Sequence, residues 1–234
     1  MFGAAVSHDG QVPGLTPRQL AREETLRRIK RLALDQLAES GAGELSLRAI
    51  ARELNLVSSA IYRYFSSRDE LITALITDAY NDLADTLEAA AGSERRGPRR
   101  RWRDTCLALR DWALREPHRF GLIYGTAIPG YRAPQTTVAP AARVFTAFFG
   151  PAVPGVTADL PVTGRQLRGQ LVTAARALEL DLDESATLAM VAAFARIIGA
   201  VSLELGGHFV GTFEPADDFY ATLVDREADL LGLS

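Results

Sequence analysis

Apolar residues recur every three to four positions along most of this chain, which is the spacing of helices that bury one face. Segments rich in glycine, proline and small polar residues interrupt the pattern, and the sequence shows no sustained alternation of apolar and polar residues. The pattern therefore predicts an all-α protein of nine or ten helices. We expect them at residues 17–40, 47–54, 58–65, 68–91, 99–116, 117–124, 141–149, 165–178, 184–206 and 216–231.

Residues that satisfy the unpaired N–H groups of a first helical turn support several of these starts. Thr16 precedes Pro17 and stands three residues before Gln19, which is the pattern of a capping box. Ser46 and Asp183 directly precede two later periodic segments, where short polar side chains are favoured as caps. The first fifteen residues show no periodicity, and we expect a flexible tail there.

The composition is that of an ordinary globular protein, since 47% of the 234 residues are hydrophobic and 24% are charged. A single cysteine, Cys106, excludes an internal disulfide framework and a multi-cysteine metal site. The N-terminus lacks the basic start and apolar stretch of a signal peptide. The most apolar segment, residues 190–205, contains Arg196 and Glu204, so we expect a cytoplasmic protein without a membrane span.

Charge is distributed unevenly along the chain. Residues 18–68 contain ten basic and six acidic residues, whereas residues 69–234 contain sixteen basic and twenty-two acidic residues. The net charge of −3 argues against a protein that coats nucleic acid with its whole surface. A basic N-terminal segment on an acidic body indicates instead that only this segment meets a polyanion.

Residues 47–68, LRAIARELNLVSSAIYRYFSSR, combine two short amphipathic helices with a tight turn. In a helix-turn-helix motif, the second helix enters the major groove of DNA while the first crosses the backbone. The turn needs a residue that tolerates the left-handed conformation, and Asn55 is the best choice after glycine. The two helices also need apolar residues that share a core, and those expected there are Leu47, Ile50, Ala51, Leu54, Ile61 and Phe65.

The second helix of this motif carries small and hydrogen-bonding residues, which allow a helix to approach base edges. The candidates for base contacts are Ser58, Ser59, Ala60 and Arg63. The candidates for phosphate contacts are Ser46, Arg48, Tyr62, Tyr64 and Arg68. A helical hairpin with its tyrosines inside a core is the alternative, but the capped, basic helix start directly after the aromatic residues favours DNA binding.

The motif resembles the N-terminal signature of the tetracycline-repressor (TetR) family over about residues 20–75. The matching elements are Ile50-Ala51, Leu54-Asn55-Leu56-Val57, Ile61-Tyr62-Arg63-Tyr64-Phe65 and Ser67-Arg68-Asp69-Glu70-Leu71. The chain departs from the family's usual glycine at Asn55, hydroxyl residue at Val57, histidine at Tyr64 and lysine at Arg68. Because valine cannot cap a helix with its side chain, we expect the cap of the following helix to move to Ser58.

The C-terminal two-thirds resembles the family in helical architecture and, more locally, an actinobacterial subgroup of these regulators. The local similarity lies in residues 119–124, 129–134, 197–199 and 202–205. That subgroup often has a histidine before the glycine of its late helix. Ile198 stands at this position, so any role of that histidine is absent here.

The resemblance implies three regions: a tail over residues 1–15, a helix-turn-helix domain over 16–66 and a ligand-binding and dimerisation domain over 67–234. It also implies a homodimer in which the last two helices of each subunit form a four-helix interface, so that two recognition helices meet a palindromic operator on double-stranded DNA. A small molecule in the C-terminal domain would then move the fourth helix and release a repressor from DNA. Control by a protein partner rather than a metabolite is the alternative.

The last two predicted helices offer small and apolar residues that suit such an interface, although packing within one subunit would also account for them. The small residues are Ala189, Ala192, Ala193, Ala195, Gly199 and Ala200. The apolar residues expected to be exposed there are Leu188, Val191, Leu203, Leu223, Leu230 and Leu231.

Other apolar residues on several C-terminal helices are candidates for a pocket, because apolar sites between helices commonly bind small molecules. These candidates are Trp102, Cys106, Phe120, Tyr124, Phe145, Phe149 and Phe194. Each of them could instead belong to the core. If they line a pocket, the effector is an apolar or aromatic molecule.

The sequence offers no residues for catalysis, a cofactor or a metal site. The three histidines, His8, His118 and His208, lie far apart and without clustered carboxylates. The chain contains neither a glycine-rich phosphate loop nor a Gly-x-Ser-x-Gly nucleophile elbow. We therefore expect a transcriptional regulator and not an enzyme.

Overall fold

The computed structural model describes residues 16–40, 44–92, 95–158 and 160–234. Over these residues the protein contains ten α-helices and no strand, which confirms the predicted all-α class. The tail expected over residues 1–15 lies outside the described residues. The chain divides into two compact units, Met1–Ser67 and Arg68–Ser234.

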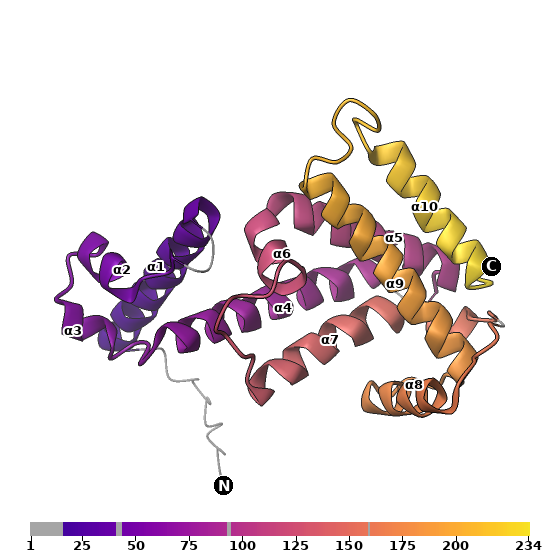
Figure 1. Cartoon of the computed structure of the whole chain (residues 1–234), viewed down its shortest axis with the longest axis horizontal. Coiled ribbons are helices and arrows are strands. Elements are labelled where there is room, and N and C mark those ends of the chain that lie inside the picture. Colours follow the sequence, from indigo (N-terminus) through magenta and orange to yellow (C-terminus); the bar gives the residue numbers. More distant parts are fainter. Residues whose placement is uncertain (1–15, 41–43, 93–94, 159) are drawn as a thin grey trace, which may run out of the picture. The chain divides into compact units, whose positions relative to one another are not determined.

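The N-terminal unit, called the head below, contains three helices (Figure 1). Their apolar side chains form a small core. They are α1 (Pro17–Ser40), α2 (Leu47–Glu53) and α3 (Ser58–Ile61). The largest buried side chains are those of Ile29, Leu47, Ile50, Ile61 and Phe65. Leu54, which the sequence placed in this core, is only partly buried because it follows the last turn of α2.

Capping predictions are confirmed at three helix starts. The Gln19 side-chain oxygen accepts a hydrogen bond from the Thr16 N–H at 2.8 Å, and the Thr16 hydroxyl oxygen accepts one from the Gln19 N–H at 3.3 Å. Ser46 caps α2 and Asp183 caps α9 (Glu184–Leu205) in the same way, at 3.3 Å and 2.8 Å. These local bonds explain why the starts could be predicted from sequence.

The helix α3 is shorter than predicted, because its α-helical segment ends at Ile61 instead of Phe65. The chain continues to wind beyond Ile61 through tighter bonds between residues three apart. The Arg63 N–H donates to the Ala60 carbonyl at 3.1 Å, and the Tyr64 N–H donates to the Ile61 carbonyl at 2.9 Å. Residues 58–65, called the recognition segment below, therefore form one α-helical turn followed by tighter turns that reach Phe65.

The start of α3 also differs from the expectation that its cap would move to Ser58. Val57 is the N-cap residue, and its carbonyl oxygen accepts a hydrogen bond from the Ala60 N–H at 2.8 Å. Its side chain makes no capping bond. Replacing a hydroxyl residue by valine thus leaves the start of the helix in place without a side-chain cap.

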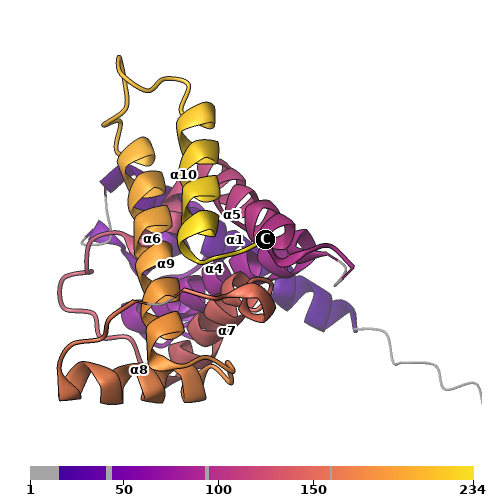
Figure 2. The same ribbon diagram turned by 90° about the vertical axis from the view of Figure 1, so that its right-hand side faces the viewer.

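The C-terminal unit is a bundle of seven α-helices (Figures 1 and 2). They are α4 (Arg68–Ala91), α5 (Pro98–Arg115), α6 (Pro117–Tyr124), α7 (Val138–Phe149), α8 (Arg165–Ala177), α9 and α10 (Asp217–Leu230). Two short 3₁₀-helices, η2 (Gln135–Thr137) and η3 (Val153–Gly155), flank α7. Helix α4 packs against α5, α6 and α7, while α9 packs against α5, α6, α8 and α10.

Helix α7 begins three residues earlier than predicted, at Val138, so the loop expected over residues 126–140 is shorter. The proline-rich sequence suggested a break there. Pro140, however, lies in the first turn of α7, where the helix has no need of its missing N–H group. The helix therefore includes the proline instead of starting after it.

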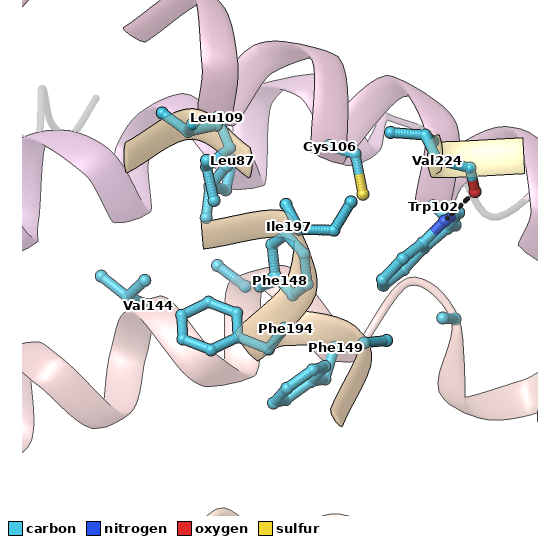
Figure 3. Close-up of a cluster of buried hydrophobic side chains, with 14 of the residues drawn as sticks. Leu87, Trp102, Cys106, Leu109, Val144, Phe148, Phe149, Phe194, Ile197 and Val224 are labelled. Carbon is cyan, nitrogen blue, oxygen red and sulfur yellow. Dashed lines mark hydrogen bonds between the residues drawn. The ribbon is translucent and has the colours of Figure 1, made fainter. Parts of the chain in front are cut away.

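Aromatic and aliphatic side chains from α4, α5, α7, α9 and α10 fill the core of this unit (Figure 3). The ring of Trp102 is fully buried, packs edge-on against Phe148 at 5.1 Å between centroids, and donates its indole N–H to the Val224 carbonyl at 3.1 Å. Cys106 and Ile197 are also fully buried in this cluster.

Leu231 was expected on the surface but is buried in the same core, with 1% of its side chain exposed. The chain turns back at Gly232, whose φ of 72° is easily adopted only by glycine, and the Leu233 N–H then donates to the Ala228 carbonyl at 2.9 Å. This turn directs the last residues of the chain inward.

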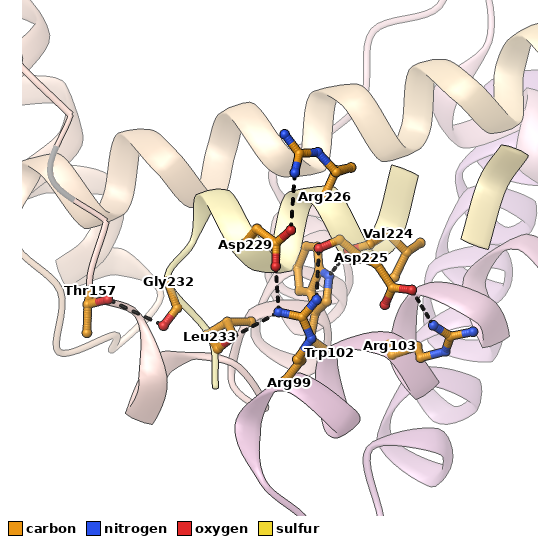
Figure 4. Close-up of polar contacts among 10 residues, drawn as sticks. All are labelled: Arg99, Trp102, Arg103, Thr157, Val224, Asp225, Arg226, Asp229, Gly232 and Leu233. Atoms are coloured by element: carbon orange, nitrogen blue, oxygen red, sulfur yellow. Dashed lines mark hydrogen bonds and ion pairs between the residues drawn. The ribbon is translucent and has the colours of Figure 1, made fainter. Parts of the chain in front are cut away.

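Two arginine–aspartate ion pairs connect α10 with the start of α5 (Figure 4). The Arg99 guanidinium lies 2.7 Å from the Asp229 carboxylate, and the Arg103 guanidinium lies 2.5 Å from the Asp225 carboxylate. All four side chains remain more than one-third exposed, so each pair adds at most about 1 kcal/mol.

Helix α9 is long and apolar enough to cross a membrane by length and composition alone. Half of that apolar stretch is buried inside the unit, as in a core helix of a water-soluble protein, so this finding is weak evidence for a membrane span.

Candidate nucleic-acid interface

The turn between α2 and α3 has the geometry that a helix-turn-helix requires. Asn55 adopts a φ of 55°, the left-handed conformation predicted for it. The Leu56 N–H then donates to the Ala51 carbonyl at 2.8 Å and closes the end of α2. Asparagine adopts this conformation at low cost because its short polar side chain can hydrogen-bond locally.

The nine candidate DNA contacts divide by exposure. The exposed ones are Arg48, Ser58, Ser59, Tyr62 and Arg63. The partly buried ones are Ser46, Ala60, Tyr64 and Arg68, and the last of these is the first residue of α4 in the C-terminal unit. Apart from Arg68, all of them belong to the head.

Two of the partly buried residues have partners inside the head. Ser46 caps α2 with its hydroxyl, and its N–H donates to the side-chain oxygen of Gln36 at 3.1 Å. The Arg22 guanidinium of α1 lies over the Tyr64 ring, 5.0 Å from the centroid, in a cation–π contact. Tyr64 therefore helps to hold α1 against the segment after α3, whatever its role towards phosphate.

A hollow of about 720 Å³ lies beside α2 and the turn before α3. It is lined by Ser46, Arg48, Ala49, Arg52, Leu56, Val57 and Ser58. Arg52 was not among the predicted contacts, although it stands four residues after Arg48 and therefore on the same face of α2. Two guanidinium groups beside a hollow suit the geometry of phosphate oxygens.

Five of the seven candidate ligand residues form a continuous row of aromatic contacts in the C-terminal unit. The centroid distances are 5.3 Å for Phe120–Tyr124, 5.9 Å for Tyr124–Phe194, 4.8 Å for Phe194–Phe145 and 5.7 Å for Phe145–Phe149. All seven candidates belong to the core of this unit or pack against it, and Figure 3 shows Trp102, Cys106, Phe149 and Phe194 within it. Burial raises the pKa of the Tyr124 hydroxyl, which hydrogen-bonds none of the described residues.

An apolar hollow of about 500 Å³ lies among η2, α7, α8 and α9 and opens to solvent. Of the seven candidates, Phe145 and Phe149 line it. Most of its other lining residues are alanines and leucines, among them Ala141, Ala174, Leu178, Leu180 and Leu182. Helical periodicity does not identify these alanines and leucines as pocket residues, because they come together only when α7 and α8 pack beside α9.

Two protein-family models match the chain. The model for bacterial regulatory proteins of the tetR family matches residues 29–75, and the model for the tetracyclin repressor-like C-terminal domain matches residues 102–226. An HTH-type transcriptional regulator of Mycobacterium tuberculosis is 39% identical in an alignment of 202 positions that covers 82% of this chain and 85% of the relative. This chain belongs to the TetR family. The resemblance carried by residues 50–71 is thereby confirmed.

Solved structures agree with the TetR fold. The crystal structure of the regulatory protein SCO4313 matches with a TM-score of 0.73 and 34% identity, over 92% of this chain and all of the other. A tetR-family regulator from Streptomyces coelicolor has a TM-score of 0.59 at 20% identity and covers 89% of this chain and 80% of its own. A TetR variant from Acinetobacter baumannii, in complex with minocycline, has a TM-score of 0.51 at 18% identity, over 88% and 97% of the two chains.

Membership of the TetR family makes the head a DNA-binding helix-turn-helix and the protein a transcriptional regulator, not an enzyme. Over the described residues, no group of three or more histidine, cysteine, aspartate and glutamate side chains is placed to hold a metal ion. The function that family membership shows for this chain is DNA binding through the head.

Proposed function

We propose that this TetR-family regulator is a homodimeric repressor that binds a palindromic operator and releases it when an apolar small molecule enters the hollow among α7, α8 and α9. The observation that carries the proposal is this apolar hollow in a chain whose head is a DNA-binding helix-turn-helix. Control by a protein partner needs no such hollow, so the hollow favours a small molecule.

In the proposed complex, α3 and the turns that follow it as far as Phe65 enter the major groove. Ser58, Ser59, Ala60 and Arg63 meet base edges. The residues that meet phosphates on either side are Ser46, Arg48, Tyr62, Tyr64 and Arg68, and Arg52 joins them because it lines the same hollow as Arg48. Small side chains at positions 58–60 support this arrangement, because they let the backbone approach the bases.

Exposed apolar side chains on α9 and α10 support the homodimer. Leu203 of α9 and Leu230 of α10 are 46% and 58% exposed, and the proposed interface would cover both. Gly199 on α9 has no side-chain neighbour within 4 Å of where a Cβ would lie, which leaves room for a second helix. A two-fold symmetric dimer matches a palindromic operator, whose half-sites lie about 34 Å apart and each take one α3.

The lining of the hollow among α7, α8 and α9 restricts the effector to an uncharged, mainly apolar molecule. None of its lining residues carries a charge. Its two hydroxyl groups already donate hydrogen bonds to backbone carbonyls, Thr137 to Pro134 at 2.8 Å and Thr187 to Asp183 at 2.6 Å. A charged group placed there would lose its hydration without gaining a partner. That the related fold in Acinetobacter baumannii holds minocycline agrees with a small-molecule role for this domain.

Contacts between α7 and α4 would transmit a change at this hollow to the helix that directly follows the head in sequence. Phe145 and Phe149 line the hollow from α7, and Arg143 on the same helix pairs with Glu88 of α4 at 2.9 Å. Helix α4 begins at Arg68, directly after the last residue of the head. A shift of α7 on ligand binding would thus pass to the helix that follows the recognition segment. To move the balance from 1:99 to 99:1, the ligand must favour the released state by ~5.5 kcal/mol.

The ligand site can be tested with N-phenyl-1-naphthylamine, an uncharged fluorophore that brightens in apolar surroundings. Ala141→Trp fills the hollow, whereas Ala139→Trp places the same ring at an exposed position of α7 outside it. We expect the dye to bind wild type and the Ala139 variant but not the Ala141 variant. Equal binding by both variants, or none by wild type, would contradict the proposed site.

A further inference from the structure

Val57 is the most exposed of the large hydrophobic side chains in the described part of the chain, at 72%. Folding of the head does not account for a valine at this place. The side chain makes no capping bond, and only the Val57 carbonyl participates in α3, by accepting the hydrogen bond from Ala60. An apolar group left in water forgoes the stabilisation that burial would give, and a partner that covers it would recover that stabilisation.

The surroundings of Val57 indicate what provides this cover. Val57 lines the head's hollow together with Arg48 and Arg52, two cations of α2. It directly precedes Ser58 and Ser59, which are exposed and polar. A surface that combines guanidinium groups, hydroxyl groups and one apolar side chain suits a polyanion that also presents an apolar group. In the major groove of DNA, the apolar group on base edges is the C5-methyl of thymine.

We propose that Val57 is a specificity-determining residue and that its side chain packs against the C5-methyl group of a thymine at one fixed position of each operator half-site. This proposal rests on the proposed binding of α3 in the major groove. The contact is purely apolar, whereas serine at this position would lack the branched side chain and its hydroxyl group would instead bond a phosphate or a hydrogen-bonding base edge.

The test replaces the methyl group alone. Operators are first selected from randomised DNA duplexes with the full-length protein. Each thymine of one half-site is then replaced singly by deoxyuridine, which lacks only the C5-methyl group, and affinities are measured for wild type, Val57→Ala and Val210→Ala. Val210 is a matched control because it is also highly exposed, at 68%, but lies in the connection between α9 and α10.

We expect one thymine at which deoxyuridine weakens binding of wild type and of the Val210 variant about fourfold. This is the loss for one buried methyl-sized group, about 0.8 kcal/mol, converted at about 1.4 kcal/mol per tenfold change. At the same position the Val57→Ala variant should bind both duplexes equally. Circular dichroism should show that this variant is folded, since the replaced side chain is exposed.

Three results would overturn the inference. If no thymine is sensitive to deoxyuridine in wild type, the methyl contact does not exist. If Val57→Ala remains as sensitive as wild type, another residue makes the contact. If Val57→Ala lowers affinity for both duplexes equally, Val57 packs against sugar or backbone instead. Failure of the selection to enrich any sequence would overturn the proposed operator binding itself, and this inference with it.

Discussion

Two nitrogens of the Arg110 guanidinium each lie 2.7 Å from one oxygen of the Glu204 carboxylate. The two side chains are largely withdrawn from solvent, at 8% and 15% exposed. A further guanidinium nitrogen lies 3.2 Å from Asp217 at the start of α10. One arginine of α5 thus holds both helices of the proposed dimer interface, and its hydrogen bonds with Glu204 raise the pKa of Arg110 above its ordinary value.

Arg110→Ala should destabilise the protein by about 3–5 kcal/mol, because removing one partner of a buried pair leaves the other charge uncompensated. Urea unfolding measures the loss. The double variant Arg110→Ala, Glu204→Ala should recover part of it, since the carboxylate is then absent as well. A single variant within about 1 kcal/mol of wild type would show that the pair has no such role.

Leu203→Arg should convert the dimer into a monomer, because it places a charge in the proposed interface, where burial without a partner is costly. Light scattering after gel filtration measures the mass. Leu114→Arg is the matched control, since Leu114 is exposed to a similar degree, 42%, but lies on α5. Wild type that is monomeric, or a Leu203 variant that stays dimeric, would contradict the proposed interface.

Arg48→Ala and Arg52→Ala should each weaken binding to all DNA sequences. Each should also reduce the slope of log affinity against log salt by about 1.8, because the proposed homodimer loses one phosphate contact, worth about 0.9, in each of its two subunits. Arg176→Ala, at an exposed position of α8, should change neither quantity. Fluorescence anisotropy between about 50 and 200 mM salt provides the slopes. An unchanged slope in both head variants would exclude phosphate contacts at the hollow of the head.

The Cys106 thiol should not react with Ellman's reagent in the native protein at pH 8. Burial raises its pKa well above the ordinary value, and the thiolate that reacts is therefore not formed. The side chain is also fully buried. Unfolding in guanidinium should release one reactive thiol per chain, since Cys106 is the only cysteine. Rapid reaction of native protein would show that this core opens.

Features fixed by neighbouring residues could be predicted from sequence. The caps at Thr16, Ser46 and Asp183 and the left-handed turn at Asn55 each depend on a few adjacent residues, and the structure has all four. The inward turn of Leu231 was missed because burial at the end of a chain depends on distant elements.

The residues that line the C-terminal hollow could not be predicted from sequence for the same reason, because they come from distant elements. The sequence suggests aromatic residues as pocket candidates, yet alanines such as Ala141 and Ala174 create the space because they are small. Which small residues face each other depends on how α7 and α8 pack, and periodicity within one helix carries no such information. From the sequence, Val57 is recognisable only as a residue whose side chain cannot cap α3. The exposure of that side chain is a property of the folded head.

Selection from randomised duplexes, followed by footprinting of the enriched duplex, measures whether this regulator recognises one operator sequence. We predict an inverted repeat whose half-sites are about one helical turn apart or a multiple of it, with protection that persists at about 200 mM salt, where contacts to phosphates alone have weakened greatly. A pool that remains random after selection, with equal affinity for all duplexes, would show that the protein binds DNA without recognising its sequence.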